Sequence, residues 1–281
     1  MAKVVSLINM KGGVGKSTLS VNLAWHLAAY SNWKKKVLVV DLDPQFNASQ
    51  YLVGVNKYNK MLEDGKPTIW DIFEQHTKTP TNKVGKKIKA TEVIRNIVKY
   101  RGGGQIDLIP SRLELSLSLK SSSQRPHLLN KLLNEVKDDY DIVLIDCAPT
   151  ESMLTTAAYI SSDYILVPVK PEYLSTIGLP LLKSSVESFL DEYNENELEV
   201  LGIIFNGTEG YIPEENKSKN EVKAMAIKNN WTIFDSEIPY SRSYPKGARE
   251  GKPIFGTSYA RTVQCDNFRE FADEFGRRAG L

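Results

Sequence analysis

A glycine-rich turn between an apolar run and a helical pattern constrains this chain more than any other feature. Residues 3–9 form a short apolar run that is typical of a buried strand. Gly12, Gly13 and Gly15 follow it, and residues 16–30 then carry leucines at four-residue spacing, which predicts a helix. A strand, a glycine turn and a helix in direct succession predict a layered α/β structure.

Further apolar runs recur along the chain, with helical patterns between them. Continuous apolar strands separated by helices are typical of a parallel sheet that is covered on both faces. We therefore predict an α/β fold in which a mostly parallel, twisted sheet is flanked by helices on both faces. The expected further strands are residues 37–40, 106–109, 141–145, 164–169 and 200–205, and the clearest further helices are residues 128–136 and 181–190.

The composition is that of an ordinary globular protein, with 41% hydrophobic and 25% charged residues and a net charge of +2. Neither a repeat nor a low-complexity linker divides the chain, so we expect one domain over residues 1–281. No apolar run approaches the roughly 20 residues that a membrane span needs, and the N-terminus lacks the apolar core of a signal peptide. Cys147 and Cys265 have no metal-binding spacing. These features predict a cytoplasmic protein.

Two polar stretches interrupt the alternation of strands and helices. Residues 54–105 and 206–220 are expected to form loops or peripheral helices. The first stretch carries a basic run, for which a solvated face is the simplest interpretation. That run consists of Lys83, Lys86, Lys87 and Lys89.

The glycine turn has the chemistry of a phosphate-binding loop. Glycines let backbone N–H groups approach a phosphate closely. Lys16 is placed to reach the β- and γ-phosphates, Ser17 offers a hydroxyl to Mg²⁺, and the helix that follows points its positive end at the anion. The general loop pattern would require glycine at position 10, but this chain has Met10 there and a second lysine, Lys11, beside it. The turn therefore predicts binding of ATP and Mg²⁺ by an unusual loop.

Two apolar strands end in aspartates. Asp43 follows the run at 37–40, and Asp146 follows the run at 141–145. In a parallel sheet both would emerge at the edge where the phosphate loop lies. A carboxylate at such a position can hold Mg²⁺ through water. A single aspartate at a strand end is often only a turn residue, but two of them after a phosphate loop favour a nucleotide site.

These segments together resemble the ParA/MinD family of ATPases. Residues 11–18 are similar to the deviant Walker A loop of that family. Residues 41–48 resemble the next motif of the ParA branch, whose usual form has glycine where this chain has Phe46, and residues 145–149 resemble the Walker B and switch II segment. Three shorter stretches also resemble ParA proteins, namely residues 108–111, 238–239 and 250–254.

The resemblance implies a role for each site residue. Lys11 would reach the nucleotide of a partner subunit and Asp43 would position the attacking water, so Lys11, Lys16 and Asp43 are the expected catalytic residues. Ser17 and, through water, Asp146 would hold the metal, whereas Asp41 would be a supporting carboxylate. The expected nucleotide contacts are Lys11, Gly12, Gly13, Val14, Gly15, Lys16, Ser17, Thr18, Asn206 and Pro239, the last two at the adenine.

The ParA branch further implies a function in partition. Its members form an ATP-dependent homodimer, bind DNA without sequence preference, and hydrolyse ATP slowly until a ParB-like centromere-binding protein stimulates them. Such a protein would be nucleoid-associated and would segregate a plasmid or chromosome. The candidate DNA contacts are Lys217, Lys219, Lys223, Arg242, Lys246, Arg249, Lys252 and Arg261, among which acidic residues are frequent.

Two other functions share this ATPase core. One is a ParA-like ATPase that positions a protein assembly, and the other is a MinD-like membrane-associated ATPase. The second needs a terminal amphipathic helix with a basic polar face. Phe268, Phe271 and Phe275 do have helical spacing, but a mixed set of acids and arginines accompanies them. We therefore expect this helix to pack on the protein body. Because the phosphate loop begins at residue 11, we expect no DNA-reading segment before it.

Overall fold

The computed structural model describes residues 1–29, 33–74, 88–120, 125–172, 178–194, 196–210, 212–258 and 260–281. Within them the strands form one eight-stranded sheet in the order β3-β4-β2-β5-β1-β6-β7-β8. Neighbouring strands run parallel, except for the antiparallel pair β3 and β4. The strands are β1 (Lys3–Leu7), β2 (Lys36–Leu42), β3 (Arg95–Lys99), β4 (Gln105–Ile109), β5 (Ile142–Cys147), β6 (Tyr164–Val169), β7 (Glu199–Thr208) and β8 (Ile238–Pro239).

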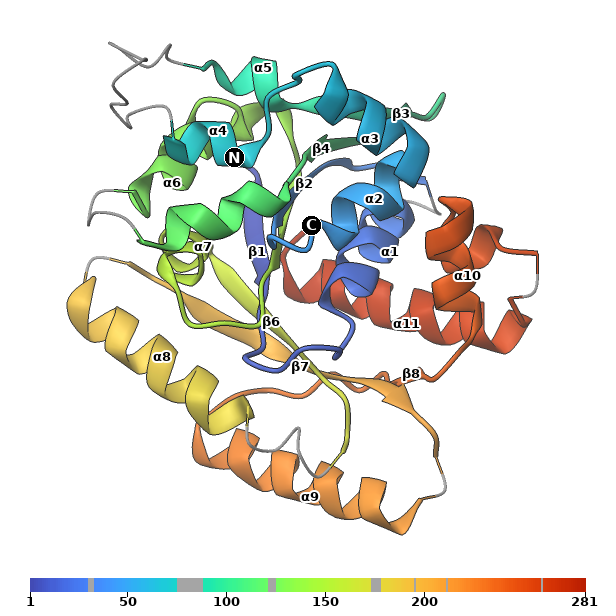
Figure 1. The fold of residues 1–281 in the computed structure, drawn as a ribbon. Helices are drawn as coiled ribbons and strands as arrows, with labels where there is room; N and C mark the ends of the chain where they lie inside the picture. The colour runs from blue at the N-terminus through green and yellow to red at the C-terminus, as the bar shows by residue number, and fades with distance from the viewer. Residues whose placement is uncertain are drawn as a thin grey trace.

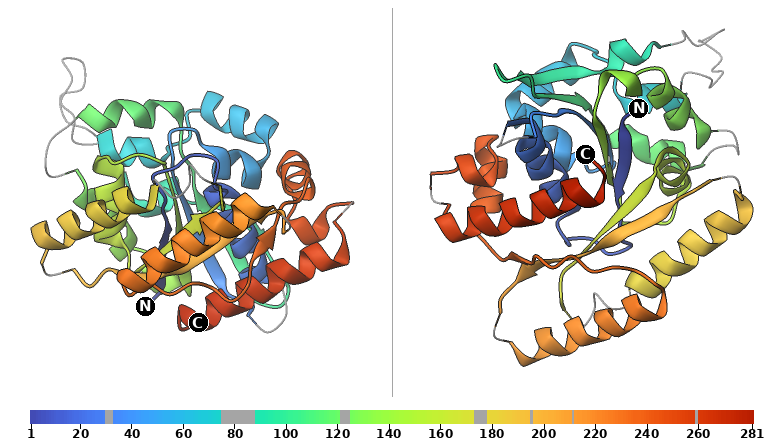
Figure 2. Two further views of the ribbon diagram at one scale, coloured as in Figure 1. Left: turned by 90° about the horizontal axis from the view of Figure 1, so that it is seen from below. Right: turned by 180° about the vertical axis from the view of Figure 1, so that it is seen from behind.

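Helices cover both faces of the sheet (Figures 1 and 2). Buried side chains of α1, α2 and α11 form one core with one face, whereas those of α4, α6, α7, α8 and α9 form a second core with the other. The helices are α1 (Lys16–Ala29), α2 (Asn47–Val53), α3 (Val55–Glu63), α4 (Ile69–Glu74), α5 (Ala90–Val93), α6 (His127–Asn134), α7 (Met153–Ser161), α8 (Gly178–Glu192), α9 (Pro213–Lys228), α10 (Ser243–Glu250) and α11 (Thr262–Arg278), with short 3-10 turns η1 (Leu113–Lys120), η2 (Lys137–Asp139) and η4 (Ile254–Gly256).

The covering of both faces explains why the strands read as unbroken apolar runs. On β1, Val5 and Leu7 face the core beside α1, whereas Val4 points into the opposite core. Successive side chains of a strand point to opposite faces, so a strand buried on both sides needs apolar residues at every position. The predicted α/β fold with a mostly parallel sheet between two layers of helices is confirmed.

The register of the central strands brings the predicted acidic residues to one edge. Asp41 on β2 pairs with Asp146 on β5, and Asp146 pairs with Leu7 at the end of β1 on its other side. The loop after β1 therefore leaves the sheet beside both carboxylates. This is the edge where open parallel sheets bind ligands.

Several elements lie in the two polar stretches. The antiparallel edge strand β3 lies within residues 54–105, and α9 begins at Pro213 within residues 206–220. Both elements expose polar side chains on one side, so their sequences lack the continuous apolar run of a central strand. Of the basic run, Lys89 precedes α5. The other members, Lys83, Lys86 and Lys87, lie outside the described residues.

The C-terminal helix α11 buries its aromatic face. Phe268, Phe271 and Phe275 are each fully buried in the core that α11 shares with α1 and the sheet. The rings of Phe268 and Phe271 meet edge to face at 5.9 Å between centroids. The stripe therefore packs on the protein body, as its mixed polar face predicted. Over the described ranges, no helix combines the length and the apolar character that crossing a membrane requires.

Candidate nucleotide site

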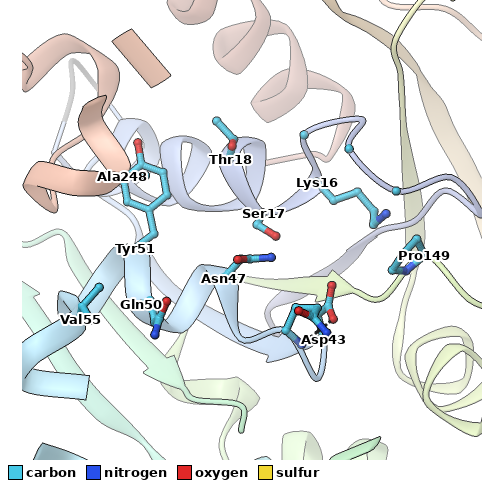
Figure 3. Close-up of a pocket in the computed structure, with 14 residues that line it drawn as sticks. Lys16, Ser17, Thr18, Asp43, Asn47, Gln50, Tyr51, Val55, Pro149 and Ala248 are labelled. Atoms are coloured by element: carbon cyan, nitrogen blue, oxygen red, sulfur yellow. Dashed lines mark hydrogen bonds between the residues drawn. The ribbon is translucent and has the colours of Figure 1, made fainter. Parts of the chain in front are cut away.

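A cavity of about 550 Å³ opens beside the glycine loop at the carboxyl edge of the sheet (Figure 3). Its walls come from that loop and the start of α1, from the turn between β2 and α2, and from α2, α3 and α10. The described residues that line it are Gly12, Gly13, Gly15, Lys16, Ser17, Thr18, Asp43, Gln45, Asn47, Gln50, Tyr51, Val55, Pro149 and Ala248.

The glycines give the loop its curvature. Gly13 and Gly15 have positive φ angles of 76° and 92°, which favour glycine strongly. A Cβ atom at Gly15 would lie 2.2 Å from the Nδ2 atom of Asn206, which donates a hydrogen bond of 2.7 Å to the carbonyl of Val14. Asn206 thus holds the loop from the side of β7. Since α1 begins at Lys16, its positive end faces the same space.

The Lys16 ammonium lies at the centre of the loop. Lys16 is 6% exposed, and its Nζ atom donates hydrogen bonds of 3.2 Å to the carbonyls of Asn9 and Lys11. Burial lowers its pKa, and the nearby carboxylate of Asp146 opposes that change. An ammonium has three donors, so Lys16 can give a further hydrogen bond to a phosphate oxygen.

Asp146 has the properties of a metal-site carboxylate. It is fully buried, and its Oδ2 atom has no hydrogen-bond partner among the described residues. Burial raises its pKa well above the usual value, the charge of Asp41 adds to this effect, and a hydrogen bond from Ser17 opposes it. A buried, unsatisfied carboxylate oxygen beside a serine hydroxyl is the donor set that Mg²⁺ prefers. The residues present therefore fit this ion.

The two aspartates at the end of β2 have different surroundings. Asp41 accepts hydrogen bonds from the amide and hydroxyl of Ser49, at 2.7 and 2.6 Å, and from the amide of Asp43 at 3.2 Å. Burial raises the pKa of Asp41 to about 7. Asp43 lines the cavity instead, and its Oδ1 atom accepts the amide of Gln45 at 2.8 Å. Figure 3 shows Asp43, Asn47 and Ser17 around the same part of the cavity.

Lys11 is not among the described residues that line this cavity. Its Nζ atom lies 3.5 Å from the carboxylate of Glu172, which also pairs with Lys170. The Lys11 amide donates to the Oδ1 atom of Asn9, and a Cβ atom at Gly178 would lie 2.9 Å from that oxygen. The close approach of α8 therefore fixes Lys11 on the side of the loop that faces β6 and α8.

The sequence-predicted nucleotide contacts divide into two groups. Gly12, Gly13, Gly15, Lys16, Ser17 and Thr18 line the cavity. Val14 is buried, and Asn206 and Pro239 lie on the β7–β8 side of the loop and are not among the lining residues. The adenine contact of these last two stays a prediction.

Sequence reasoning missed half of the cavity wall. Gln45 and Asn47 lie inside the segment 41–48 that resembles the ParA motif, and that resemblance could have indicated them as cavity residues. Tyr51 reaches the wall because its hydroxyl accepts a hydrogen bond of 3.2 Å from the side-chain Nδ2 atom of Asn22 and donates one of 3.2 Å to the carbonyl of Lys252. Pro149 ends the segment 145–149 that resembles the Walker B and switch II motif. No local pattern marks the remaining three, Gln50, Val55 and Ala248.

The candidate DNA contacts also fall into separate groups. Arg242, Lys246 and Arg261 line a second cavity of about 460 Å³ together with Tyr240, Ser241, Ser243 and Gln264. Lys217 and Lys223 are exposed on α9, which lies apart from α10 in Figure 1. Arg249 is exposed on α10, and Lys252 is exposed just after it, 3.6 Å from Glu250.

Lys219 differs from the other candidates on α9. Its side chain is 11% exposed, and its Nζ atom lies 2.8 Å from Glu215 and 2.6 Å from Glu237. Two carboxylates therefore already neutralise this ammonium, and little of it reaches solvent. The DNA surface that we propose does not include Lys219.

The comparisons with known proteins agree with this geometry. A family model described as an AAA domain matches residues 2–200. The chain is 30% identical over 257 residues to the sporulation initiation inhibitor protein Soj of Bacillus subtilis, covering 90% of each chain. It is 30% identical over 284 residues to the chromosome-partitioning ATPase Soj of Treponema pallidum, covering 100% of this chain and 99% of the relative.

A solved structure extends the likeness to the whole fold. The McdA–ATP complex of Cyanothece superposes with a TM-score of 0.78 at 19% identity, over 100% of this chain and 97% of that one. The family model, the full-length relatives and the glycine loop with its second lysine lead to the same assignment. This chain belongs to the ParA family of P-loop ATPases.

Proposed function

We propose that this protein is a partition ATPase that dimerises on ATP, binds DNA without sequence preference, and segregates a plasmid or chromosome as a nucleoid-associated protein of the cytoplasm. A ParB-like centromere-binding protein would stimulate its slow hydrolysis. The single observation that carries this proposal is the position of Lys11, which lies outside the nucleotide cavity of its own subunit and beside Glu172. The full-length similarity to a chromosome-partitioning ATPase also supports it.

Hydrolysis would rest on three groups of residues in and beneath the cavity wall. Lys16 and the glycine loop would bind the phosphates, and Ser17 and, through water, Asp146 would hold Mg²⁺, which when bound neutralises phosphate charge. Asp43 would orient the attacking water, because its carboxylate is fixed at the cavity wall by the amide of Gln45. Asp43 is the one carboxylate among the described lining residues. Slow turnover is therefore expected until a partner improves the geometry.

The dimer would form with the two cavities facing each other. Lys11 of each subunit would then leave Glu172 and neutralise charge on the nucleotide of the other subunit. An arginine finger supplied in trans acts by the same electrostatics. ATP would hold the two subunits together, and hydrolysis would separate them.

DNA would bind through its phosphates. Arg242, Lys246 and Arg261 line one cavity, where their cations would contact phosphates of the DNA backbone. Lys252 follows α10, and Lys217 and Lys223 on α9 would bind phosphates at a second place. Lysine and arginine contacts to phosphate carry no sequence information, which supports binding without sequence preference.

We infer a single domain over residues 1–281. The sheet takes its strands from β1 to β8, and α11 returns to pack on α1. Over the described residues the two ends of the chain thus pack into the same sheet and core, which supports a single domain.

The proposed hydrolysis is tested by ATP turnover of the purified protein and of the Asp43→Ala variant. The wild type should turn over slowly, and faster when DNA is added together with a candidate centromere-binding protein. Asp43→Ala should bind ATP as well as the wild type and lose turnover. Asp138→Ala, an exposed aspartate on η2, is the matched control and should behave as the wild type. Full turnover by Asp43→Ala, or fast turnover by a monomer alone, would contradict the proposal.

A further inference from the structure

Phe46 adopts a backbone conformation that bulky residues avoid. Its φ and ψ angles are 46° and 30°, in the left-handed region, where the Cβ atom of an L-residue crowds the backbone. The ParA motif that residues 41–48 resemble usually has glycine at this position, which adopts the conformation without strain. Strain of this kind persists only where neighbouring structure holds it in place.

The backbone of Phe46 joins the turn that carries Asp43 to the helix α2. Its amide donates a hydrogen bond of 2.8 Å to the carbonyl of Asp43, which closes the turn. Its carbonyl accepts the amide of Gln50 at 3.0 Å, which starts α2. The conformation of this one residue therefore sets the angle between the turn and the helix.

The ring of Phe46 holds this joint from outside the cavity. It stacks on the ring of Tyr58 in α3, with 5.2 Å between centroids and 13° between planes. Phe46 itself does not line the cavity, although Gln45 and Asn47 on either side of it do. The ring thus fixes the backbone of the turn without lining the cavity.

Tyr58 is in turn anchored to the end of the sheet. It is 1% exposed, and its hydroxyl donates a hydrogen bond of 2.8 Å to the carbonyl of Ser111. The amide of Ser111 donates to the hydroxyl of Ser49 at 2.9 Å, and that hydroxyl donates to Asp41. The series of interactions that begins at Phe46 therefore returns to β2 two residues before Asp43.

We propose that Phe46 is a positioning residue for Asp43: its stack on Tyr58 holds the left-handed joint that fixes the Asp43 carboxylate at the cavity wall. The inference rests on the proposed role of Asp43 in hydrolysis. The family motif usually has glycine at this position, and glycine adopts the left-handed conformation freely. In this chain an aromatic stack would hold that conformation instead.

The test compares four variants by kcat, ATP affinity and thermal unfolding temperature. Phe46→Leu keeps an apolar side chain but removes the stack, and it should lower kcat by roughly tenfold with little change in ATP affinity, because small misplacements of a reacting group slow the chemical step. Phe46→Gly removes both the ring and the strain, so it should fold normally and also lose kcat. Phe46→Tyr keeps the stacked ring and should retain the wild-type kcat. Asp43→Ala should have no turnover.

The outcomes separate the inference from the proposed function. An inactive Asp43→Ala beside fully active Phe46→Leu and Phe46→Gly variants would overturn the inference alone. A parallel loss of kcat, ATP affinity and unfolding temperature that Phe46→Tyr does not rescue would reduce Phe46 to a packing residue and overturn it too. An active Asp43→Ala would remove the proposed role of Asp43 and the inference with it.

Discussion

Lys11 and Glu172 form an ion pair that would have to break when the proposed dimer forms, because Lys11 would then contact the nucleotide of the other subunit. Their side chains are 26% and 49% exposed, and the two charged groups lie 3.5 Å apart. Ion pairs this exposed contribute about 0–1 kcal/mol, since solvent screens them and their long side chains lose freedom. Glu172 therefore biases Lys11 toward its own subunit only weakly. A second ATP-bound subunit, with several phosphate charges, can outcompete it.

At the scale of this single residue pair we predict that Glu172→Gln strengthens the ATP-dependent dimer. Removing the competing carboxylate should raise the association constant by up to about thirtyfold, the equivalent of two exposed ion pairs of up to about 1 kcal/mol each, because Lys11 of each subunit would leave one. Analytical ultracentrifugation with ATP measures this directly. Glu187→Gln on α8 is the matched control, because Glu187 pairs with Lys183 on its own helix. If the Glu172→Gln dimer is weaker than the wild-type dimer, Lys11 does not leave Glu172 for the nucleotide of the other subunit.

The helices α1 and α11 are joined through a buried histidine. The Nε2 atom of His26 lies 2.9 Å from Asp273, which also accepts a hydrogen bond of 2.6 Å from the indole of Trp33. Burial lowers the pKa of His26, although the hydrogen bond to Asp273 opposes this. Burial would raise the pKa of Asp273, but its hydrogen bonds from Trp33 and His26 lower it. Since α1 carries the phosphate loop at its start, this interaction supports the site from behind.

At the element scale this interaction predicts acid sensitivity. A histidine whose pKa is lower in the folded state than its usual 6.5 binds a proton more readily when unfolded, so stability is lost as pH falls below that value. Asp273, whose pKa is also lowered, loses its contribution in the same direction at still lower pH. Asp41, whose pKa burial raises to about 7, acts in the opposite direction over this range, but it does so in the wild type and in a His26→Gln variant alike. Between about pH 7.5 and about pH 5.5, acidification should therefore lower the free energy of unfolding in urea more, or raise it less, in the wild type than in His26→Gln. Equal slopes for the two proteins would contradict this.

The same scale explains which elements could be predicted from the sequence. The central strands were found because burial on both faces requires unbroken apolar runs, as in Val37 to Val40 of β2. The edge strand β3 was missed because its residues are only half-buried, and β8 because it has just two residues. The strand ends at Asp43 and Asp146 could be placed because parallel strands share one carboxyl edge. Tertiary packing alone brings Ala248 of α10 to the cavity.

At the scale of the whole molecule, the proposed DNA surface predicts a change in salt dependence. Replacing Arg242, Lys246 and Arg261 together by Gln should weaken ATP-dependent DNA binding. The slope of log K against log salt concentration should flatten by about 0.9 for each phosphate that the variant no longer neutralises. Fluorescence anisotropy with duplexes of two unrelated sequences measures the slope. The control replaces three exposed lysines on other elements, Lys36, Lys99 and Lys131. An unchanged slope in the variant that lacks Arg242, Lys246 and Arg261 would mean that DNA binds to a different surface.

We propose that one molecule supplies only part of the residues that a complete nucleotide site needs. The glycine loop, Lys16, Ser17 and Asp43 surround one cavity, whereas Lys11 lies beyond its wall. We therefore propose that ATP binding and the dimer are linked through Lys11.

The decisive measurement is the molar mass of the Asp43→Ala protein with ATP and Mg²⁺, obtained by light scattering with and without the Lys11→Gln substitution. Asp43→Ala should trap the ATP-bound dimer, because hydrolysis no longer separates the subunits. The Asp43→Ala, Lys11→Gln protein should still bind ATP, as calorimetry would show, and remain monomeric. If that double variant dimerises as readily as Asp43→Ala alone, Lys11 does not complete the site of the partner subunit and the proposed link is wrong.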